Sequence, residues 1–396
     1  MVWRTGRRVR LPRTGDVDGL MRALSIIVAV AWFFSFTRTL LHLRVIPRLR
    51  AGEVPLRTPL VSVIVPARNE ERVIEQTVRA WLAQTYAPFE LIVVNDRSSD
   101  RTGEILHAGD DPRLVVIDGE EPPPGWLGKP WALHEGSQVA RGEMLLFADA
   151  DVIYAPEALQ AVIAHQQRTD ARVVALLPHF EMRGFWENAA MPQLPLTALT
   201  FLPLWLSNRT RIAVLALGGG PGNLVARADY DAVGGHEALR DSVVDDIALA
   251  RLVRRKLHHR TEAIRADDLV SLRMYHGLRE IIDGFTKNFF FAFGRSYVAA
   301  VIALLAGFAF HVLPYLLALR GDPYAIATVV LITLTRLVLF GSLGYSLLAA
   351  VFLHPVMILV WGYITLRSMW YTGVRRQLQW RGRTYDAGES RFGAGR

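Results

Sequence analysis

The stretch Leu145-Leu146-Phe147-Ala148-Asp149-Ala150-Asp151-Val152 runs from apolar residues directly into two aspartates. Its apolar half predicts a short buried strand. In an extended chain residues i and i+2 point the same way, so Asp149 and Asp151 can direct two carboxylates at one point beyond the end of that strand. Hard oxygen ligands of this kind suit Mg²⁺ or Mn²⁺, and such an ion suits a diphosphate. The alternative is a solvated turn that carries a spare acid.

Around this stretch, short apolar segments alternate with segments of helical spacing. Strands are expected over 60–65, 91–94, 114–117 and 144–148, and helices over 70–84, from 99 onwards and over 131–140. This pattern predicts an α/β fold, with a parallel sheet and helices on both faces. Ligands bind beyond the carboxyl ends of such strands. Asn69, Asp96 and the Asp149/Asp151 pair all follow strand ends, so we expect them at one edge of the sheet.

The composition narrows the possible partners. The 396 residues include no cysteine, which excludes disulfides, thiolate metal sites and a cysteine nucleophile. A formal net charge of +8 fits an anionic membrane surface, a nucleic acid or a phosphate-bearing substrate. The sequence has no zinc-ligand spacing and no RNA-binding signature, so we expect no nucleic-acid partner. Hydrophobic residues make up 51% of the chain, which indicates that they are concentrated in particular segments.

These apolar segments lie at the two ends of the chain. At the N-terminal end we expect a basic segment over 1–19, a transmembrane helix over 20–43 and a linker with three prolines over 44–59. A retained anchor is favoured over a cleaved signal peptide, because no small-x-small cleavage site directly follows the apolar run. At the C-terminal end we expect an aromatic interfacial helix over 277–296, transmembrane helices over 297–370 and a basic tail over 371–396.

Two questions about the membrane segments stay open at this point. Spans are expected at 298–319, 325–339 and 347–366, and three crossings from a cytoplasmic domain place the basic tail outside, against the positive-inside rule. Either one stretch is re-entrant, or two form a hairpin that does not cross, or the tail breaks the rule. The segment 184–217 holds three prolines and is either a broken, membrane-skimming segment or a Pro-rich core subdomain.

Four motifs follow one another along the chain: VSVIVPARNE (61–70), VVNDRSSDRT (93–102), ADADV (148–152) and VDD (244–246). In this order they resemble the family 2 glycosyltransferases with a GT-A fold, over about residues 60–290, with the domain itself expected at 60–276. The resemblance implies that four residues hold the nucleoside of the donor: Pro66, Asn69, Glu70 and Asp96.

The same resemblance implies that Asp149 and Asp151 hold the Mg²⁺ or Mn²⁺ that bridges the donor diphosphate. It also implies that Asp246, with Asp245 as the alternative, removes the proton from the acceptor hydroxyl. Acids at a helix start also favour the helix dipole, so a structural interpretation of this pair remains. The departing diphosphate needs a cation, for which Lys129 is the candidate and a surface lysine the alternative. The Gly-rich loop 218–223 is expected to be flexible and to let the backbone approach a ligand closely.

A narrower resemblance rests on GWLGKPWAL (125–133), Phe185-Trp186, VDDIALARLV (244–253) and MYHGLREIIDGFTKN (274–288). These motifs are similar to bacterial membrane glycosyltransferases of hopanoid and carotenoid pathways and, more distantly, to ceramide glucosyltransferases. The resemblance implies inverting transfer of one sugar, from a nucleotide-diphosphate sugar such as a UDP-sugar to a membrane-embedded lipid hydroxyl. It further implies a multi-pass protein of the inner cell membrane with a cytoplasmic catalytic domain.

One departure from the family pattern bears on this expectation. The Gln-x-x-Arg-Trp motif of ceramide-type and processive enzymes is absent downstream of the acid pair. Its absence counts against the first alternative, a processive polysaccharide synthase. A second alternative is a non-catalytic membrane scaffold that kept the fold, and the presence of both acid pairs argues against it.

Overall fold

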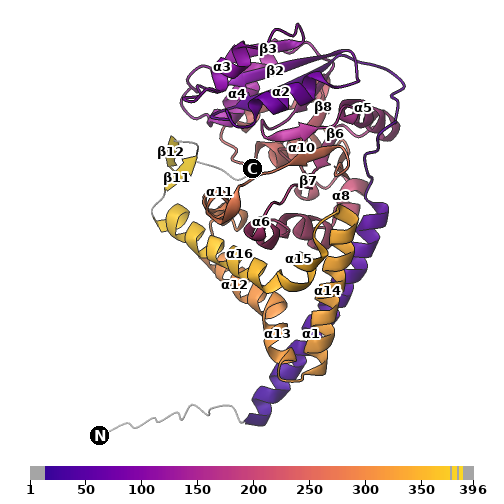
Figure 1. Ribbon diagram of the computed structural model, residues 1–396, viewed down its shortest axis with the longest axis vertical. Helices are drawn as coiled ribbons and strands as arrows, with labels where there is room; N and C mark the ends of the chain where they lie inside the picture. Colours follow the sequence, from indigo (N-terminus) through magenta and orange to yellow (C-terminus); the bar gives the residue numbers. More distant parts are fainter. Residues whose placement is uncertain (1–13, 375–376, 381–382, 387–396) are drawn as a thin grey trace.

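The computed structural model describes residues 14–374, 377–380 and 383–386, in a sheet domain with apolar helices projecting from it (Figure 1). Of the basic segment expected over 1–19, residues 1–13 lie outside the described residues, and 14–19 belong to the first helix. Residues 375–376, 381–382 and 387–396 of the expected tail also lie outside the described residues.

The sheet domain confirms the α/β expectation. Seven strands lie in the order β3-β2-β1-β4-β8-β6-β9, and all run parallel except β8, which is antiparallel to β4 and β6. Their bounds are β1 Val61–Ala67, β2 Phe89–Asn95, β3 Leu114–Asp118, β4 Met144–Phe147, β6 Val173–Leu177, β8 Asn223–Ala226 and β9 Thr261–Arg265. A small second sheet joins β5 Val152–Tyr154, β10 Val270–Leu272 and β7 His179–Phe180.

Helices cover both faces of the main sheet because the buried strands alternate their side chains between two apolar clusters. Val63 and Val65 of β1 pack towards α2 Ile74–Leu82, α3 Thr102–His107 and α5 Ala158–Thr169. Ile64 packs towards α4 Gly128–Val139, α9 Arg227–Val233 and α10 Asp245–Leu257. With both faces covered, the carboxyl ends of β1, β2 and β4 form the exposed edge that carries the candidate residues.

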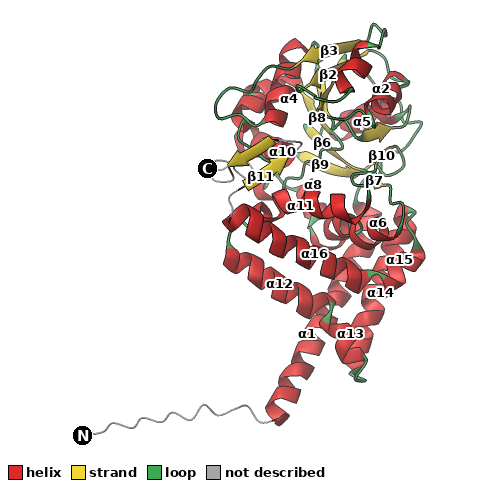
Figure 2. Cartoon of the chain, turned by 60° about the vertical axis from the view of Figure 1, so that its left-hand side comes forward, coloured by secondary structure: helices red, strands yellow, loops and turns green. Residues whose placement is uncertain are grey.

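Within the described residues, three helical stretches are long and apolar enough to cross a membrane. They are Gly19–Val45 in α1 Thr14–Val45, Tyr297–Ala318 in the pair α12 Tyr297–His311 and α13 Leu313–Ala318, and α14 Pro323–Leu343. They project together away from the sheet, with α1 alongside α14 (Figures 1 and 2). Trp32 of α1 is fully buried, and its Nε1 donates a hydrogen bond of 2.9 Å to the carbonyl of Phe310. After α1, the chain docks on the sheet domain, where the N–H of Leu49 bonds to the carbonyl of Arg265.

The stretch 347–366 does not form the single span expected there. It is divided between α15 Leu347–Phe352 and α16 His354–Ser368, with Pro355 in the first turn of α16. Proline lacks an N–H and fits only the first turn of a helix, so a new helix begins here. Trp361 Nε1 donates to the carbonyl of Ala190 in α6 Phe185–Ala190, so α16 packs back beneath the sheet domain.

The end of the described chain lies on the sheet side of the projecting helices. The hairpin β11 Gln377–Trp380 and β12 Arg383–Asp386 lies beside α11 Gly277–Ala292 (Figure 1). The expected interfacial helix is therefore α11, and it is packed against α16, with Ile281 fully buried. This course fits the alternatives in which part of the C-terminal apolar sequence does not cross.

The Pro-rich segment 184–217 combines features of both interpretations. It is broken into short pieces: α6, α7 Gln193–Leu196, the π turn η1 Thr197–Phe201, α8 Leu204–Arg209 and the 3₁₀ turn η2 Ala213–Leu215. Leu196 and Leu199 are buried in one cluster with Leu339 and Trp361 of the C-terminal helices. Phe185 and Trp186 at its start are exposed at 55% and 41%. The segment thus forms the floor between the sheet and the projecting helices.

Candidate active site

One ion cluster joins three elements at the end of β4. Lys129, the second residue of α4, places Nζ 2.6 Å from Oδ1 of Asp149 and 3.8 Å from Oδ1 of Asp245, the first residue of α10. Burial lowers the pKa of Lys129, but the carboxylates of Asp149, Asp245 and Asp246 outweigh burial and raise it. The expected cation is therefore charged and lies between the two acid pairs.

The turn after β4 places the two aspartates differently from the sequence expectation. β4 ends at Phe147, and Ala150 and Asp151 form a turn before β5, so the backbone is not extended here. Asp149 faces Lys129, whereas Asp151 lines a cavity of about 360 Å³. The pKa of Tyr154 in β5 is raised by burial first, and then by the charges of Asp149 and Asp151.

The cavity beside Asp151 also holds two of the residues expected to bind the nucleoside. Asn69 and Glu70 line it, together with Arg273 and His276 from the segment after β10. A polar cavity with carboxylates, an arginine and a histidine suits a charged ligand more than an apolar one. The sequence predicted no role for His276. This residue lies in the motif MYHGLREIIDGFTKN (274–288), which indicated only a resemblance to membrane glycosyltransferases.

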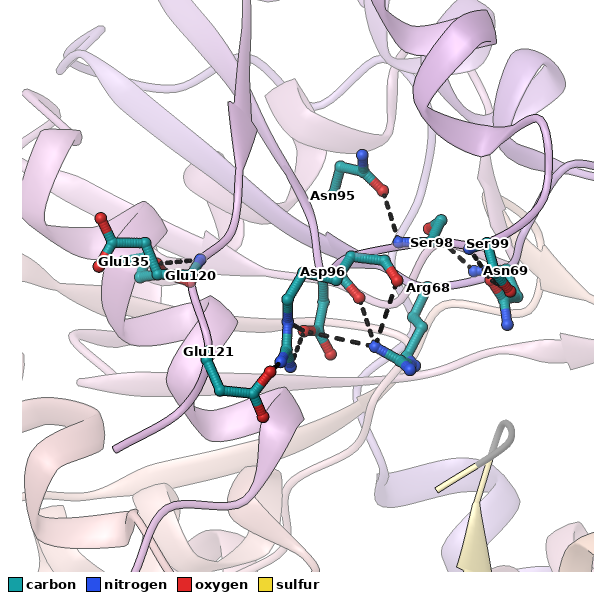
Figure 3. A network of polar contacts seen from close by, with 10 residues as sticks. Arg68, Asn69, Asn95, Asp96, Ser98, Ser99, Glu120, Glu121 and Glu135 are labelled. Atoms are coloured by element: carbon teal, nitrogen blue, oxygen red, sulfur yellow. Dashed lines mark hydrogen bonds and ion pairs between the residues drawn. The ribbon is translucent and has the colours of Figure 1, made fainter. Parts of the chain in front are cut away.

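Backbone turns at the ends of β1 and β2 are joined side by side (Figure 3). Asn69 has φ of 54°, and its Oδ1 accepts a 2.8 Å hydrogen bond from the N–H of Ser99. The carboxylate of Asp96 is held 2.9 Å from the guanidinium of Arg97 and 3.7 Å from that of Arg68. Pro66 lies one strand position before these turns, in β1. The residues expected at this edge are thus assembled there.

The Gly-rich loop 218–223 packs closely against Asp149 and Asp246. A Cβ built on Gly220 meets Oδ2 of Asp149 at 2.0 Å, and one built on Gly218 meets the backbone oxygen of Asp246 at 2.1 Å. The N–H of Asp149 donates to the carbonyl of Gly220 at 2.9 Å. The loop therefore needs glycine at both positions because it connects the Asp149 turn with the start of α10.

The pKa values of the two neighbouring acids of α10 are shifted in opposite directions. Burial raises the pKa of Asp245, but Lys129 and buried His236 outweigh it, so that pKa is lowered. Burial, followed by the charge of Asp245, raises the pKa of Asp246 to about 6. A pair of acids whose environments separate their pKa values is typical of acid–base sites. Asp246 is the member whose pKa suits proton transfer near neutral pH.

His236 is a residue that the sequence interpretation missed. It is buried, and its Nε2 lies 3.9 Å from Oδ2 of Asp245, within ion-pair range. Its Nδ1 lies 2.8 Å from the hydroxyl of Tyr230, which also donates to Ser137 Oγ at 3.1 Å. The imidazole orientation is fixed from two sides, so His236 holds Asp245 in place. The only sequence signal was its position after Gly234-Gly235, nine residues before Asp245.

The carboxylate oxygens of Asp149 and Asp151 are the groups at this site that could bind a metal ion. Among the described residues no group of three or more His, Cys, Asp or Glu side chains is placed to hold a metal. Asp149 and Asp151 supply two carboxylates, and Mg²⁺ is commonly bound by one or two carboxylates together with substrate phosphates. The donor set therefore fits an ion that is completed by a diphosphate.

Comparisons with known proteins place the chain beside glycosyltransferases. Residues 62–216 match the profile of Glycosyl transferase family 2. The 4,4'-diaponeurosporenoate glycosyltransferase of Staphylococcus aureus (strain MRSA252) is 24% identical over 354 residues, which are 86% of this chain and 92% of that protein. The protein of the same name from Staphylococcus haemolyticus (strain JCSC1435) is 27% identical over 276 residues, 69% of this chain and 71% of that one.

Among solved structures, a mannosyltransferase from Pyrobaculum calidifontis in complex with GDP-Man and Mn²⁺ is 19% identical. The match covers 89% of this chain and 99% of that chain, with a TM-score of 0.48.

Proposed function

We propose that this chain, a member of the family 2 glycosyltransferases, transfers one sugar from a nucleotide-diphosphate sugar to a lipid acceptor in the membrane, with inversion at the anomeric carbon. The observation that carries the proposal is the position of Lys129, with its ammonium 2.6 Å from Asp149 and 3.8 Å from Asp245. An ammonium group at that point can stabilise the negative charge that develops on the departing diphosphate. The same ammonium group remains beside Asp245 and Asp246, the acid pair that receives the proton.

On the donor side, the turns after β1 and β2 bind the nucleoside through Pro66, Asn69, Glu70 and Asp96. Asp149 and Asp151 hold Mg²⁺ or Mn²⁺, which when bound supplies a Lewis acid for the diphosphate. Lys129 neutralises Asp149 before the donor arrives and contacts a diphosphate oxygen afterwards. The support is the shared sheet edge and the polar cavity that Asn69, Glu70 and Asp151 line together.

On the acceptor side, Asp246 takes the proton from the acceptor hydroxyl as its oxygen attacks the anomeric carbon. The bond between that carbon and the diphosphate oxygen breaks on the opposite face, and the electron pair leaves with the diphosphate. The raised pKa of Asp246 supports this role, because a base works best when its pKa lies near the working pH. Asp245 stays anionic and holds Lys129 and His236.

The membrane part supports a lipid acceptor. Three long apolar helices project from the sheet domain, and exposed Phe185 and Trp186 lie at the floor between them. We infer a multi-pass protein of the inner membrane with a cytoplasmic sheet domain. In this arrangement two C-terminal crossings return the chain to the sheet side, where the described part of the basic tail lies (Figure 1).

A second acceptor group is favoured by the relatives. Their name gives a carotenoid acid as substrate. A carboxylate acceptor is already ionised at neutral pH and needs no general base. The two acceptor groups therefore differ in one measurable respect: substitution of Asp246 by Asn slows transfer to a hydroxyl by 10²–10⁴-fold, whereas transfer to a carboxylate persists.

The function is tested with membranes that contain the protein, Mn²⁺ and a panel of labelled nucleotide sugars. We expect one donor to label one lipid, whose mass increases by a single sugar. A ladder of products supports the processive synthase instead. Absence of label from every donor, with donor binding intact, contradicts the proposal.

A further inference from the structure

A large groove lies among the projecting helices, away from the acid cluster. Its volume is about 880 Å³, and its walls come from α1, from the segment 193–205 and from α12. Phe34, Phe201 and Phe310 make its lining largely apolar. Among the lining residues there is none of the acids of the sheet edge and no Lys129, so the groove is separate from the proposed reacting groups.

An arginine at the wall of this groove has no acidic partner among the residues that the structure describes. Arg38 belongs to the candidate span Gly19–Val45, and its Nε donates to the carbonyl of Thr200 at 2.7 Å. In the described part of the chain we find no carboxylate within ion-pair distance of it. Arg336, the arginine of α14, differs because its guanidinium donates to the carbonyls of Ala349 and Ala350 at 2.9 and 2.7 Å. Basic side chains near the end of a span direct their charged groups to the membrane surface, and basic sites between such helices bind anionic headgroups, so the remaining donors of Arg38 point to an anionic ligand.

The position of Arg38 along α1 indicates the depth of that ligand. Arg22 and Arg38 stand sixteen residues apart, which is about 24 Å along a helix that rises 1.5 Å per residue. This length is close to the roughly 30 Å of hydrocarbon in a bilayer. Arg38 therefore lies at the headgroup level on the sheet side, and the groove wall at Ala31 and Phe34 lies at the level of acyl chains.

A second polar group at the groove lacks a partner. Gln193 Nε2 donates to Thr197 Oγ1 at 3.0 Å, but Gln193 Oε1 is buried without any donor in the described part of the chain. Both residues line the groove. Because a buried acceptor without a donor is costly, a ligand that brings a hydroxyl satisfies it. A headgroup that carries both a negative charge and a hydrogen-bond donor could therefore bind Arg38 and Gln193 at the same time.

We propose that the groove binds one anionic phospholipid of the surrounding leaflet, with its phosphate on Arg38 and an acyl chain against Phe34, Phe201 and Phe310. The separation of the groove from the acid cluster favours a resident bilayer lipid over the sugar acceptor. Such a lipid joins α1 to the floor segment and to α12. Because it binds only the folded protein, it stabilises the bundle by mass action. This inference does not depend on the identity of the donor or of the acceptor.

The test uses the full chain, purified and transferred to nanodiscs of phosphatidylglycerol or of phosphatidylcholine. We expect native mass spectrometry to find one retained phosphatidylglycerol per protein, and the thermal midpoint to be higher in phosphatidylglycerol. Arg38→Gln should weaken retention at least tenfold. Arg22→Gln is the matched control, since Arg22 lies on the same helix but outside the groove, with its guanidinium over the ring of Tyr324.

A second variant covers the case in which Arg38→Gln fails to fold. Gly307 lines the groove, and a Cβ built on it meets nothing within 4 Å, so the side chain in Gly307→Leu begins in open space at the groove. We expect this variant to fold and to lose the lipid. Equal retention of the two phospholipids, or retention of phosphatidylglycerol in both Arg38→Gln and Gly307→Leu, overturns the proposal. Displacement of the bound lipid by an isoprenoid acceptor in stoichiometric amounts overturns it in favour of an acceptor site.

Discussion

Replacement of Gly220 by alanine isolates the contact between the Gly-rich loop and Asp149. The added Cβ lies 2.0 Å from Oδ2 and 2.9 Å from Cγ of Asp149, whereas ordinary contact begins near 3.4 Å. The carboxylate oxygen must therefore move by about 1.4 Å, which is the difference between an ordinary contact distance of 3.4 Å and the 2.0 Å to the added Cβ. It can do so by rotating, so the fold is kept, but it leaves its 2.6 Å contact with Lys129.

The expected loss follows from this displacement. A misplacement of about 1 Å at a reacting centre costs on the order of 10²-fold in rate, or about 2.7 kcal/mol of transition-state stabilisation. We expect Gly220→Ala to lower kcat about 100-fold in a transfer assay with reconstituted protein, and to leave the thermal midpoint nearly unchanged. Gly219→Ala is the matched control, since its Cβ meets only Pro221 Cδ at 3.4 Å and the Leu176 carbonyl at 3.6 Å.

Two results refute this reasoning. One is wild-type activity in Gly220→Ala, which means that the position of Asp149 does not matter for transfer. The other is an equal loss in Gly219→Ala, which means that the loop responds to any added side chain rather than to its contact with the acid.

Three further predictions concern single side chains. Because the base form of Asp246 is required and its pKa is raised to about 6, the rate of transfer to a hydroxyl should rise as pH increases through about 6, and a flat profile between pH 5 and 8 contradicts this. Lys129→Met should lower kcat by roughly 10²–10³-fold, with partial recovery in Lys129→Arg, because a preorganised charge at the leaving group is lost. Glu187 is buried and accepts hydrogen bonds from Arg273 at 2.8 Å and from the N–H of Gly277 at 3.1 Å. Glu187→Ala should therefore lower the free energy of unfolding by about 2–3 kcal/mol, measured as a lower unfolding midpoint. Glu181→Ala is the control, because the Glu181 side chain is more exposed, at 35%, and its ion pair is with the exposed Arg183.

The strands of the first half of the sheet could be predicted closely from the sequence. The expected segments 114–117 and 144–148 correspond to β3 Leu114–Asp118 and β4 Met144–Phe147, because continuous apolar runs with turn residues after them are typical of buried parallel strands. The insertion of antiparallel β8 between β4 and β6 was not predictable in this way. It depends on pairing between residues far apart in the chain, which local patterns do not encode.

For the candidate site, the residue types were predictable and their geometry was not. Asp149 and Asp151 were expected to follow each other in extended backbone, but Ala150 and Asp151 form a turn, so that Asp149 contacts Lys129 while Asp151 lines the cavity. The ion pair between Lys129 and Asp149 joins α4 to the β4 end, and His236 reaches Asp245 from another turn. These contacts arise from packing between elements. The average hydropathy of 347–366 likewise predicted one continuous helix. The structure has two helices there, α15 and α16, because the helix is interrupted just before Pro355.

The central claim is that this enzyme transfers a sugar to a lipid hydroxyl with Asp246 as the base. Its most direct test offers purified enzyme two acceptors with the same isoprenoid chain, one ending in an alcohol and one in a carboxylic acid, and counts labelled product for wild type and Asp246→Asn. We expect label on the alcohol with the wild type, and a rate at least about 100-fold lower with Asp246→Asn. Label on the acid alone, at the same rate in both proteins, contradicts this claim.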